Sequence, residues 1–191
     1  MPDAMKSVMQ TEPMRGIFAP LLSLPAWNVM RGQGSMLTFE FGEPILSIRE
    51  PVVSPSPSPK VRELMGRRRV SPVGEWHLWV YACDWRCLSR GRQIASSESS
   101  DTDMDEATRV LDGQRLMSVD IDPDNGSSTF TFDLGGTLET RPYPEGNDEQ
   151  WSLSRRAGPV FSYRRDGCYC LSNSDTLPDE ERWLPWPVVS G

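Results

Sequence analysis

Two stretches of the chain, about ninety residues apart, share one pattern of turn, alternating strand, glycine turn and second strand. The first runs from Gly34 to Arg49 and the second from Gly126 to Arg141. In the first stretch Leu37, Phe39 and Phe41 alternate with polar residues. Successive side chains of a strand point to opposite faces, so this period is typical of a half-buried strand. The pattern predicts a duplicated β-hairpin.

Each stretch is followed by a similar Glu-Trp-containing segment, Glu75 to Leu78 after the first and Glu149 to Leu153 after the second. We therefore expect each unit to be a hairpin plus a returning strand. The predicted fold is mainly β, with α+β as the alternative: antiparallel sheets from two related β-meander halves with one short helix between them. The alternative to a repeat is two ordinary hairpins that share turn chemistry.

The 191 residues are predicted to form one domain behind a short tail. Residues 1–13 are polar and lack a period, which predicts a disordered tail. Residues 14–191 are predicted to be a single β-rich domain, with pseudo-repeats at about 24–90 and 111–171. Alternating Pro and Ser at 51–60 favour an extended loop, because proline cannot donate to a sheet ladder.

Three further elements are predicted. The aromatic and β-branched run from Glu75 to Trp85 predicts one central strand covered on both faces. Asp101 and Thr102 are expected to cap a short helix over residues 103–111. The stretch from Asp179 to Trp186 is expected to form one helical turn that Pro185 ends.

The net charge of −7 argues against general nucleic-acid binding, which needs a basic face. The one basic concentration, Arg67 to Arg69 with Lys60 and Arg62 upstream, is predicted to be a solvated loop. No apolar run approaches the ~20 residues of a spanning helix, and the N-terminus lacks a signal-type apolar core. We expect a cytoplasmic protein that binds another protein, not nucleic acid or membrane, and that needs no cofactor; its oligomeric state is left open.

The four cysteines, Cys83, Cys87, Cys168 and Cys170, are predicted to be buried free thiols. A zinc site is the alternative, since Cys168 and Cys170 would share one face of a regular strand. His77, the only histidine, lies six positions before Cys83. In a regular strand the two would be roughly 20 Å apart, which excludes them as a nucleophilic pair.

The run from Asp120 to Gly126 has the carboxylate spacing of a calcium loop only in part. An EF-hand needs Gly at the sixth position and Glu at the twelfth, whereas Asn125 and Thr131 stand there. Pro123 presets φ, and Asn-Gly accepts positive φ. The run therefore predicts a hairpin loop, with calcium binding as the alternative.

Two groups of residues are candidates for contacting a protein partner. The first is an acidic stretch that could form a patch, with a solvated loop as the alternative; the second is a pair of tryptophans near the C-terminus that could cover a sheet edge or meet a partner. The candidates are Glu98, Asp101, Asp103, Asp105, Glu106, Trp183 and Trp186.

The segments Gly34 to Gly42, Glu75 to Trp79 and Leu111 to Gln114 resemble those of small β-rich bacterial proteins, some of which look like immunity proteins of polymorphic toxin systems. The resemblance covers about residues 24–170 and implies no particular binding residues. The leading hypothesis is a non-catalytic cytosolic binding protein, an immunity-type inhibitor whose acidic surface meets a basic toxin. The competing hypothesis is a zinc-binding or thiol-dependent protein that uses the four cysteines.

Overall fold

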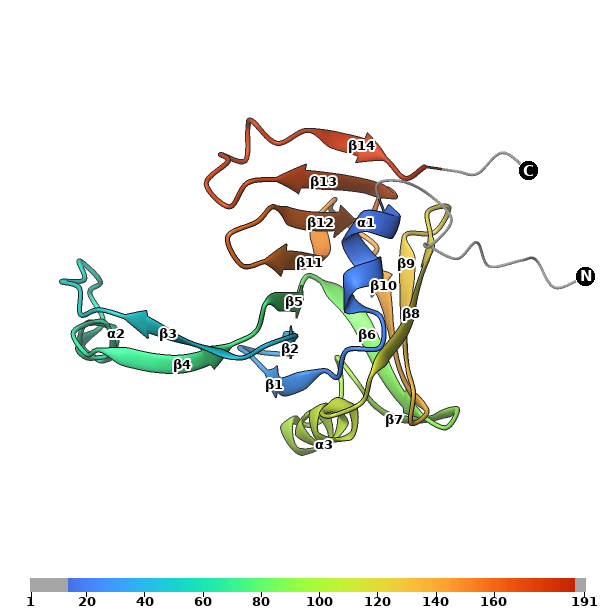
Figure 1. The fold of residues 1–191 in the computed structure, drawn as a ribbon, viewed down its shortest axis with the longest axis horizontal. Helices are drawn as coiled ribbons and strands as arrows, with labels where there is room; N and C mark the ends of the chain where they lie inside the picture. The colour runs from blue at the N-terminus through green and yellow to red at the C-terminus, as the bar shows by residue number, and fades with distance from the viewer. Residues whose placement is uncertain (1–13, 188–191) are drawn as a thin grey trace, which may run out of the picture.

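Two antiparallel sheets and a projecting two-stranded arm make up the protein (Figure 1), in a computed structural model that describes residues 14–187. The prediction of a mainly β fold with antiparallel sheets is confirmed. The predicted disordered tail, residues 1–13, lies outside the described residues.

The larger sheet has seven strands, all in antiparallel pairs. In spatial order these are β1 (Trp27–Arg31), β2 (Leu37–Phe41), β5 (Trp76–Val80), β11 (Glu149–Arg155), β12 (Val160–Arg164), β13 (Cys168–Ser172) and β14 (Trp183–Pro185).

The smaller sheet has five strands, also antiparallel. In spatial order these are β7 (Arg92–Ser96), β6 (Cys83–Ser89), β10 (Gly136–Pro142), β9 (Ser127–Phe132) and β8 (Leu116–Asp122). The remaining two strands, β3 (Ile45–Arg49) and β4 (Arg69–Val73), pair only with each other.

An aromatic core joins the two sheets. Phe39 of the larger sheet stacks on Phe132 of the smaller sheet, with ring centroids 6.3 Å apart. Trp151 meets Phe130 edge-on at 5.4 Å. Its indole nitrogen donates a hydrogen bond to Ser128 Oγ at 3.0 Å, so this buried donor is satisfied. Large buried rings contribute most of the apolar area of such a core.

Three short helices accompany the sheets: α1 (Met14–Phe18), the 3₁₀ turn η2 (Ala19–Leu21) and α3 (Asp101–Leu111). Phe18 inserts edge-on between Trp151 and Phe161, at 6.0 and 5.7 Å, so the start of the described chain closes one end of the core. A fourth helix, α2 (Pro59–Met65), belongs to the arm. Within residues 14–187 no helix has both the length and the apolar character that crossing a bilayer would take.

The hairpin prediction is right for the second stretch and wrong for the first. Strands β9 and β10 pair directly, with Thr131 opposite Thr137. Strand β2 pairs with β1 and β5 instead of β3, and β3 pairs with β4. Gly42 has a φ of 76°, which only glycine adopts readily. There the chain leaves the sheet instead of folding back on it.

The predicted single strand from Glu75 to Trp85 is divided between the two sheets. Strand β5 ends at Val80, and β6 begins at Cys83 in the other sheet. The two Glu-Trp segments lie side by side, because β5 pairs with β11 with Leu78 opposite Leu153. The two similar segments are thus neighbouring strands near the centre of the larger sheet.

Two boundary predictions are also corrected. Helix α3 begins at Asp101, and its N-cap is Ser100, whose hydroxyl accepts from the Asp103 amide at 3.2 Å. The expected helical turn at Asp179–Trp186 is replaced by β14, because Trp183 and Leu184 pair with β13. Backbone pairing with an open sheet edge wins over local helical tendency there.

Candidate functional site

The arm, residues 43–73, extends from the rest of the molecule as a twisted two-stranded ribbon with α2 at its far end (Figure 1). All five residues of β3 are exposed. Neither face of the ribbon is covered by the larger or the smaller sheet. A ribbon of two strands is marginal by itself, so this element is unusual in carrying large apolar side chains into solvent.

One face of the arm is an apolar stripe. Leu46 lies opposite Pro72, and Ile48 lies opposite Val70. Cross-strand partners share a face, so these four side chains lie together. Leu46, Ile48 and Val70 are 68%, 59% and 52% exposed. Exposed apolar side chains scattered singly are normal, but a contiguous set marks an interaction site.

The opposite face of the arm is apolar at one pair, where Ile45 lies opposite Val73, and is polar and basic beyond it. Ser47 lies opposite Ser71, and Arg49 lies opposite Arg69. The arm is therefore largely amphipathic across its thickness, although within residues 14–187 no second layer covers the apolar stripe.

The far end of the arm is folded in spite of its proline and serine content. The Pro/Ser-rich stretch forms the loop between β3 and α2. Ser58 caps α2, and the Arg62 guanidinium donates to the carbonyls of Ser56 and Pro57 at 2.8 and 2.9 Å. The Val52 amide donates to Met65 O at 2.9 Å. These bonds fix the loop against the helix, so the tip presents a defined surface.

A hollow of about 380 Å³ lies at this tip, and we call it the tip hollow. Its apolar part comes from α2, where Val61 and Leu64 are exposed. The full lining is Arg49, Val61, Leu64, Met65, Arg67, Arg68 and Arg69. An apolar floor within a rim of guanidinium groups suits an apolar side chain flanked by carboxylates.

Two of the rim arginines already have acidic partners. Arg67 pairs with Glu63, and Arg68 Nε lies 2.9 Å from a carboxylate oxygen of Glu50. Arg49 donates to the Leu64 carbonyl at 2.8 Å, and Arg69 to Ser71 Oγ at 3.2 Å. Four cations against two carboxylates leave the hollow positive. The basic run that was predicted to be a solvated loop is thus one wall of a folded hollow, and part of it lies in β4.

The arm differs in charge from the rest of the chain. The arm carries six basic and three acidic residues, a net charge of +3. The rest of the chain carries 14 basic and 24 acidic residues, a net charge of −10. A basic arm on an acidic molecule is drawn to acidic surfaces and repelled by basic ones.

The root of the arm is held by a buried carboxylate. Glu40 is buried on β2. One oxygen of its carboxylate accepts a hydrogen bond from the Gly74 amide at 2.8 Å, and the other lies 2.9 Å from His77 Nδ1. A Cβ on Gly74 would lie 2.5 Å from Phe41 O, so the chain re-enters the sheet where only glycine fits. His77 is therefore a partner of Glu40 that helps hold the arm's return strand.

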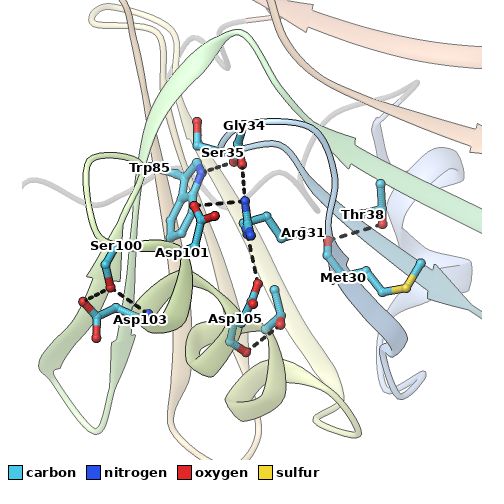
Figure 2. Close-up of polar contacts among 11 residues, drawn as sticks. Met30, Arg31, Gly34, Ser35, Thr38, Trp85, Ser100, Asp101, Asp103 and Asp105 are labelled. Atoms are coloured by element: carbon cyan, nitrogen blue, oxygen red, sulfur yellow. Dashed lines mark hydrogen bonds and ion pairs between the residues drawn. The ribbon is translucent and has the colours of Figure 1, made fainter. Parts of the chain in front are cut away.

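Most carboxylates of the predicted acidic patch already have partners, and two of them hold α3 against β1 (Figure 2). Arg31 of β1 reaches Asp105 at 2.9 Å and Asp101 at 3.2 Å. The hydrogen bond to Asp105 is the main reason that the pKa of Arg31 is raised. Asp103 accepts from Ser100 Oγ at 2.7 Å, and Glu106 pairs with Arg109. Of the five acids in the patch, Glu98 is exposed and has no such partner among residues 14–187.

The two C-terminal tryptophans occupy different environments. Trp186 is only 8% exposed and packs edge-on against Phe161, Tyr163 and Tyr169. It covers the aromatic cluster of the larger sheet, as an edge cover would. Trp183 is half-buried beneath the Arg164 guanidinium, 4.4 Å from the ring centre.

The four cysteines are free thiols and lie in two different sheets. Cys83 and Cys87 are on β6 and Cys168 and Cys170 on β13. Within the described part of the chain, no three His, Cys, Asp or Glu side chains come together as a metal would need. Burial raises the pKa of Cys83 and of Cys87 to about 12, so both thiols are protonated and unreactive at neutral pH.

The second half of the calcium-like run, residues 123–126, forms the hairpin turn that its turn residues predict, whereas Asp120 to Asp122 belong to β8. The turn joins β8 to β9, which pair with Asp122 opposite Ser127. Asp122 accepts from the Asp124 amide at 3.0 Å and from Asn125 Nδ2 at 2.6 Å. Its carboxylate is therefore occupied in turn hydrogen bonds.

Comparisons with known proteins leave the chain without a family. A scan against protein-family models, a search of curated proteins and a search of solved structures each find no match. The resemblance to immunity proteins stays a prediction, and function is argued from the arm and its charge alone.

Proposed function

We propose that this protein is a non-catalytic binding protein and that the arm is the element that holds its partner. The observation that carries the proposal is the apolar stripe of Leu46, Ile48, Val70 and Pro72, exposed on a ribbon that no layer of the described residues covers. Burying such side chains is worth about 1.5–3 kcal/mol each. A partner that covers the stripe recovers free energy that folding leaves unused.

The charge of the arm defines the partner's chemistry. The net +3 of residues 43–73 and the arginine rim of the tip hollow favour a protein surface with acidic residues around an apolar centre. The acidic stretch at residues 98–106 is a weaker candidate, because Arg31, Ser100 and Arg109 already engage most of its carboxylates.

A photo-crosslinking residue placed at Val70 tests the proposal in the cells from which the protein comes. We expect an adduct with a protein at this position and none with the probe at Leu134, an exposed leucine of the β9–β10 turn. The double change Leu46→Ser and Ile48→Ser should abolish the adduct, and Leu134→Ser should not. Equal adducts at both positions, or none at Val70, would contradict the proposal.

Inhibition of a basic toxin is a second proposal, which the net −10 outside the arm supports. It predicts that the captured partner is basic and that neutralising Glu98 weakens capture. If the bound partner is acidic and the arm variants no longer bind it, the proposal of a basic toxin is contradicted.

A further inference from the structure

We infer that the arm's partner is a second copy of this chain, whose acidic β13–β14 loop (residues 173–182) enters the tip hollow. The inference rests on the proposed function of the arm and names the occupant of the tip hollow. The tip hollow requires an exposed segment with an apolar residue at its centre and acidic residues around it. The segment must also be placed so that each of two copies can bind the other.

The β13–β14 loop has that composition. Leu177 is 57% exposed, and acids lie on both sides of it, Asp175 before and Asp179 and Glu180 after. Two turns fix the loop, with the Thr176 amide donating to Asn173 O at 3.0 Å and the Glu180 amide to Leu177 O at 2.9 Å. A loop that is already ordered loses less entropy on docking than a free segment.

The carboxylates of this loop are available. Within residues 14–187, Asp175, Asp179 and Glu180 are exposed and form no salt bridge. The acidic stretch on α3 differs in this respect, because its carboxylates hold Arg31 and Arg109. The loop is thus an acidic segment with an apolar centre whose exposed carboxylates form no salt bridge within residues 14–187.

The rim of the tip hollow complements the loop. Arg67 and Arg69 are exposed beside the apolar floor of Val61 and Leu64. Leu177 would enter the floor while the acids on either side meet the guanidinium groups. Desolvated apolar contact at the centre, ringed by charge pairs, is the usual anatomy of a specific interface.

The placement of the two elements permits a closed pair. The β13–β14 loop lies on the same side of the two sheets as the arm, at the left in Figure 1. A two-fold axis between copies brings the arm of each to the loop of the other, so one interface contains the contact twice and no surface is left to propagate a filament.

Sedimentation velocity with charge-reversed variants tests the inference. The arm variant is Arg67→Glu with Arg69→Glu, and the loop variant is Asp179→Arg with Glu180→Arg. We expect the wild-type chain to dimerise, each variant alone to have a Kd at least about tenfold higher, and an equimolar mixture to restore the dimer, because both contacts of the mixed pair are again opposite in charge.

Matched controls exclude general effects of charge. Arg90→Glu with Arg92→Glu makes the same charge change at exposed positions in the β6–β7 turn and at the start of β7, and should leave dimerisation unchanged. Leu177→Ser should weaken the dimer about tenfold, and Leu134→Ser should not. Raising NaCl from about 0.05 to about 0.5 M should weaken the wild-type dimer, since exposed charges are screened.

Three results would overturn the inference. The first is that the wild-type chain is a monomer at about 100 μM, a concentration well above most specific dissociation constants. The second is that both charge-reversed variants still dimerise like the wild type. The third is that the equimolar mixture of variants does not re-form the dimer. A monomer whose Val70 probe still crosslinks to a different protein would leave the proposed function standing. A monomer that instead binds anionic vesicles through the arm would overturn the second copy as occupant and assign the arm to lipid.

Discussion

The strands β2 and β3 are neighbours in the sequence and share an alternating apolar pattern, but their apolar side chains differ in burial. Phe39 and Phe41 of β2 are fully buried between the two sheets. Leu46 and Ile48 of β3 are mostly in solvent. Alternation states which side chains share a face. Whether that face is buried depends on a second layer, which the core supplies and the arm lacks.

This contrast assigns different tasks to the two regions. The core gains stability from rings packed on both sides, as Trp151 is packed among Phe18, Phe130, Phe161 and Tyr163. Under the proposed function, the arm presents its apolar stripe to a partner. Variants that change one region should therefore leave the property of the other unaltered.

The largest expected effect is on the core. Trp151→Ala should lower the free energy of unfolding by about 3–5 kcal/mol, because it removes a buried ring and leaves a cavity. Leu46→Ala in the arm should change it by less than about 0.5 kcal/mol. Urea unfolding of the monomer measures both, and similar losses in the two variants would remove the distinction between core and arm.

Alkaline pH should also act on the core. Burial raises the pKa of Cys83 and Cys87 from 9.0 to about 12. The folded state keeps protons that the unfolded chain loses, so this contribution is complete below pH 9 and is lost as the pH rises toward 12. At pH 10 the loss is about 1.4 kcal/mol for each thiol. Changing both cysteines to alanine should flatten the pH dependence of urea unfolding between pH 8 and pH 10. An unchanged slope would contradict this assignment.

A smaller effect is expected at the root that joins the two regions. Gly74→Ala places a Cβ against Phe41 O and should cost about 1–3 kcal/mol. Gly32→Ala is the matched control, since its Cβ would meet only ordinary contact with Met36 at 3.5 Å. Thermal unfolding of both variants compares them, and equal melting temperatures would show that the root tolerates a side chain.

The smallest effect is expected where α3 meets β1. Arg31→Ala removes the pairs with Asp101 and Asp105 and should lower the melting temperature slightly, less so at high salt because exposed pairs are screened. Arg109→Ala removes a pair that lies within α3 itself and serves as the control. An Arg31→Ala variant indistinguishable from Arg109→Ala at low salt would show that the contact does not hold α3 on the sheet.

The sequence predicts the positions of the strands better than it predicts which strands pair with each other. Local alternation located β2, β9 and β10, and the turn predicted within Asp120 to Gly126 is present at residues 123–126. The pairing of β3 with β4 across nineteen intervening residues was missed, because it depends on contacts far apart in the chain. The same limit hid the arm as a site. Its signal was present in Ile45 to Ile48 and in Val70 to Val73, two apolar segments that flank the proline-rich loop.

Charge misled the sequence reasoning in a similar way. Asp101 and Asp105 form an acidic run in the sequence, but Arg31 meets them from seventy positions or more away. The acids around Leu177 were not predicted as a site, although they are exposed and form no salt bridge among residues 14–187. Composition counts charges, whereas only the fold shows which of them are already paired.

Hydrogen–deuterium exchange of the intact protein, measured across a range of concentrations, tests most directly that the arm is a formed but uncovered docking element. In dilute protein the amides of β3 and β4 should exchange much faster than those of β5 and β11, because a two-stranded ribbon opens locally while the core opens only globally. As the concentration rises, the arm and the β13–β14 loop should slow together and the core should not change. Arm amides that are as protected as the core in dilute protein, or that keep their rate at every concentration, would contradict the account.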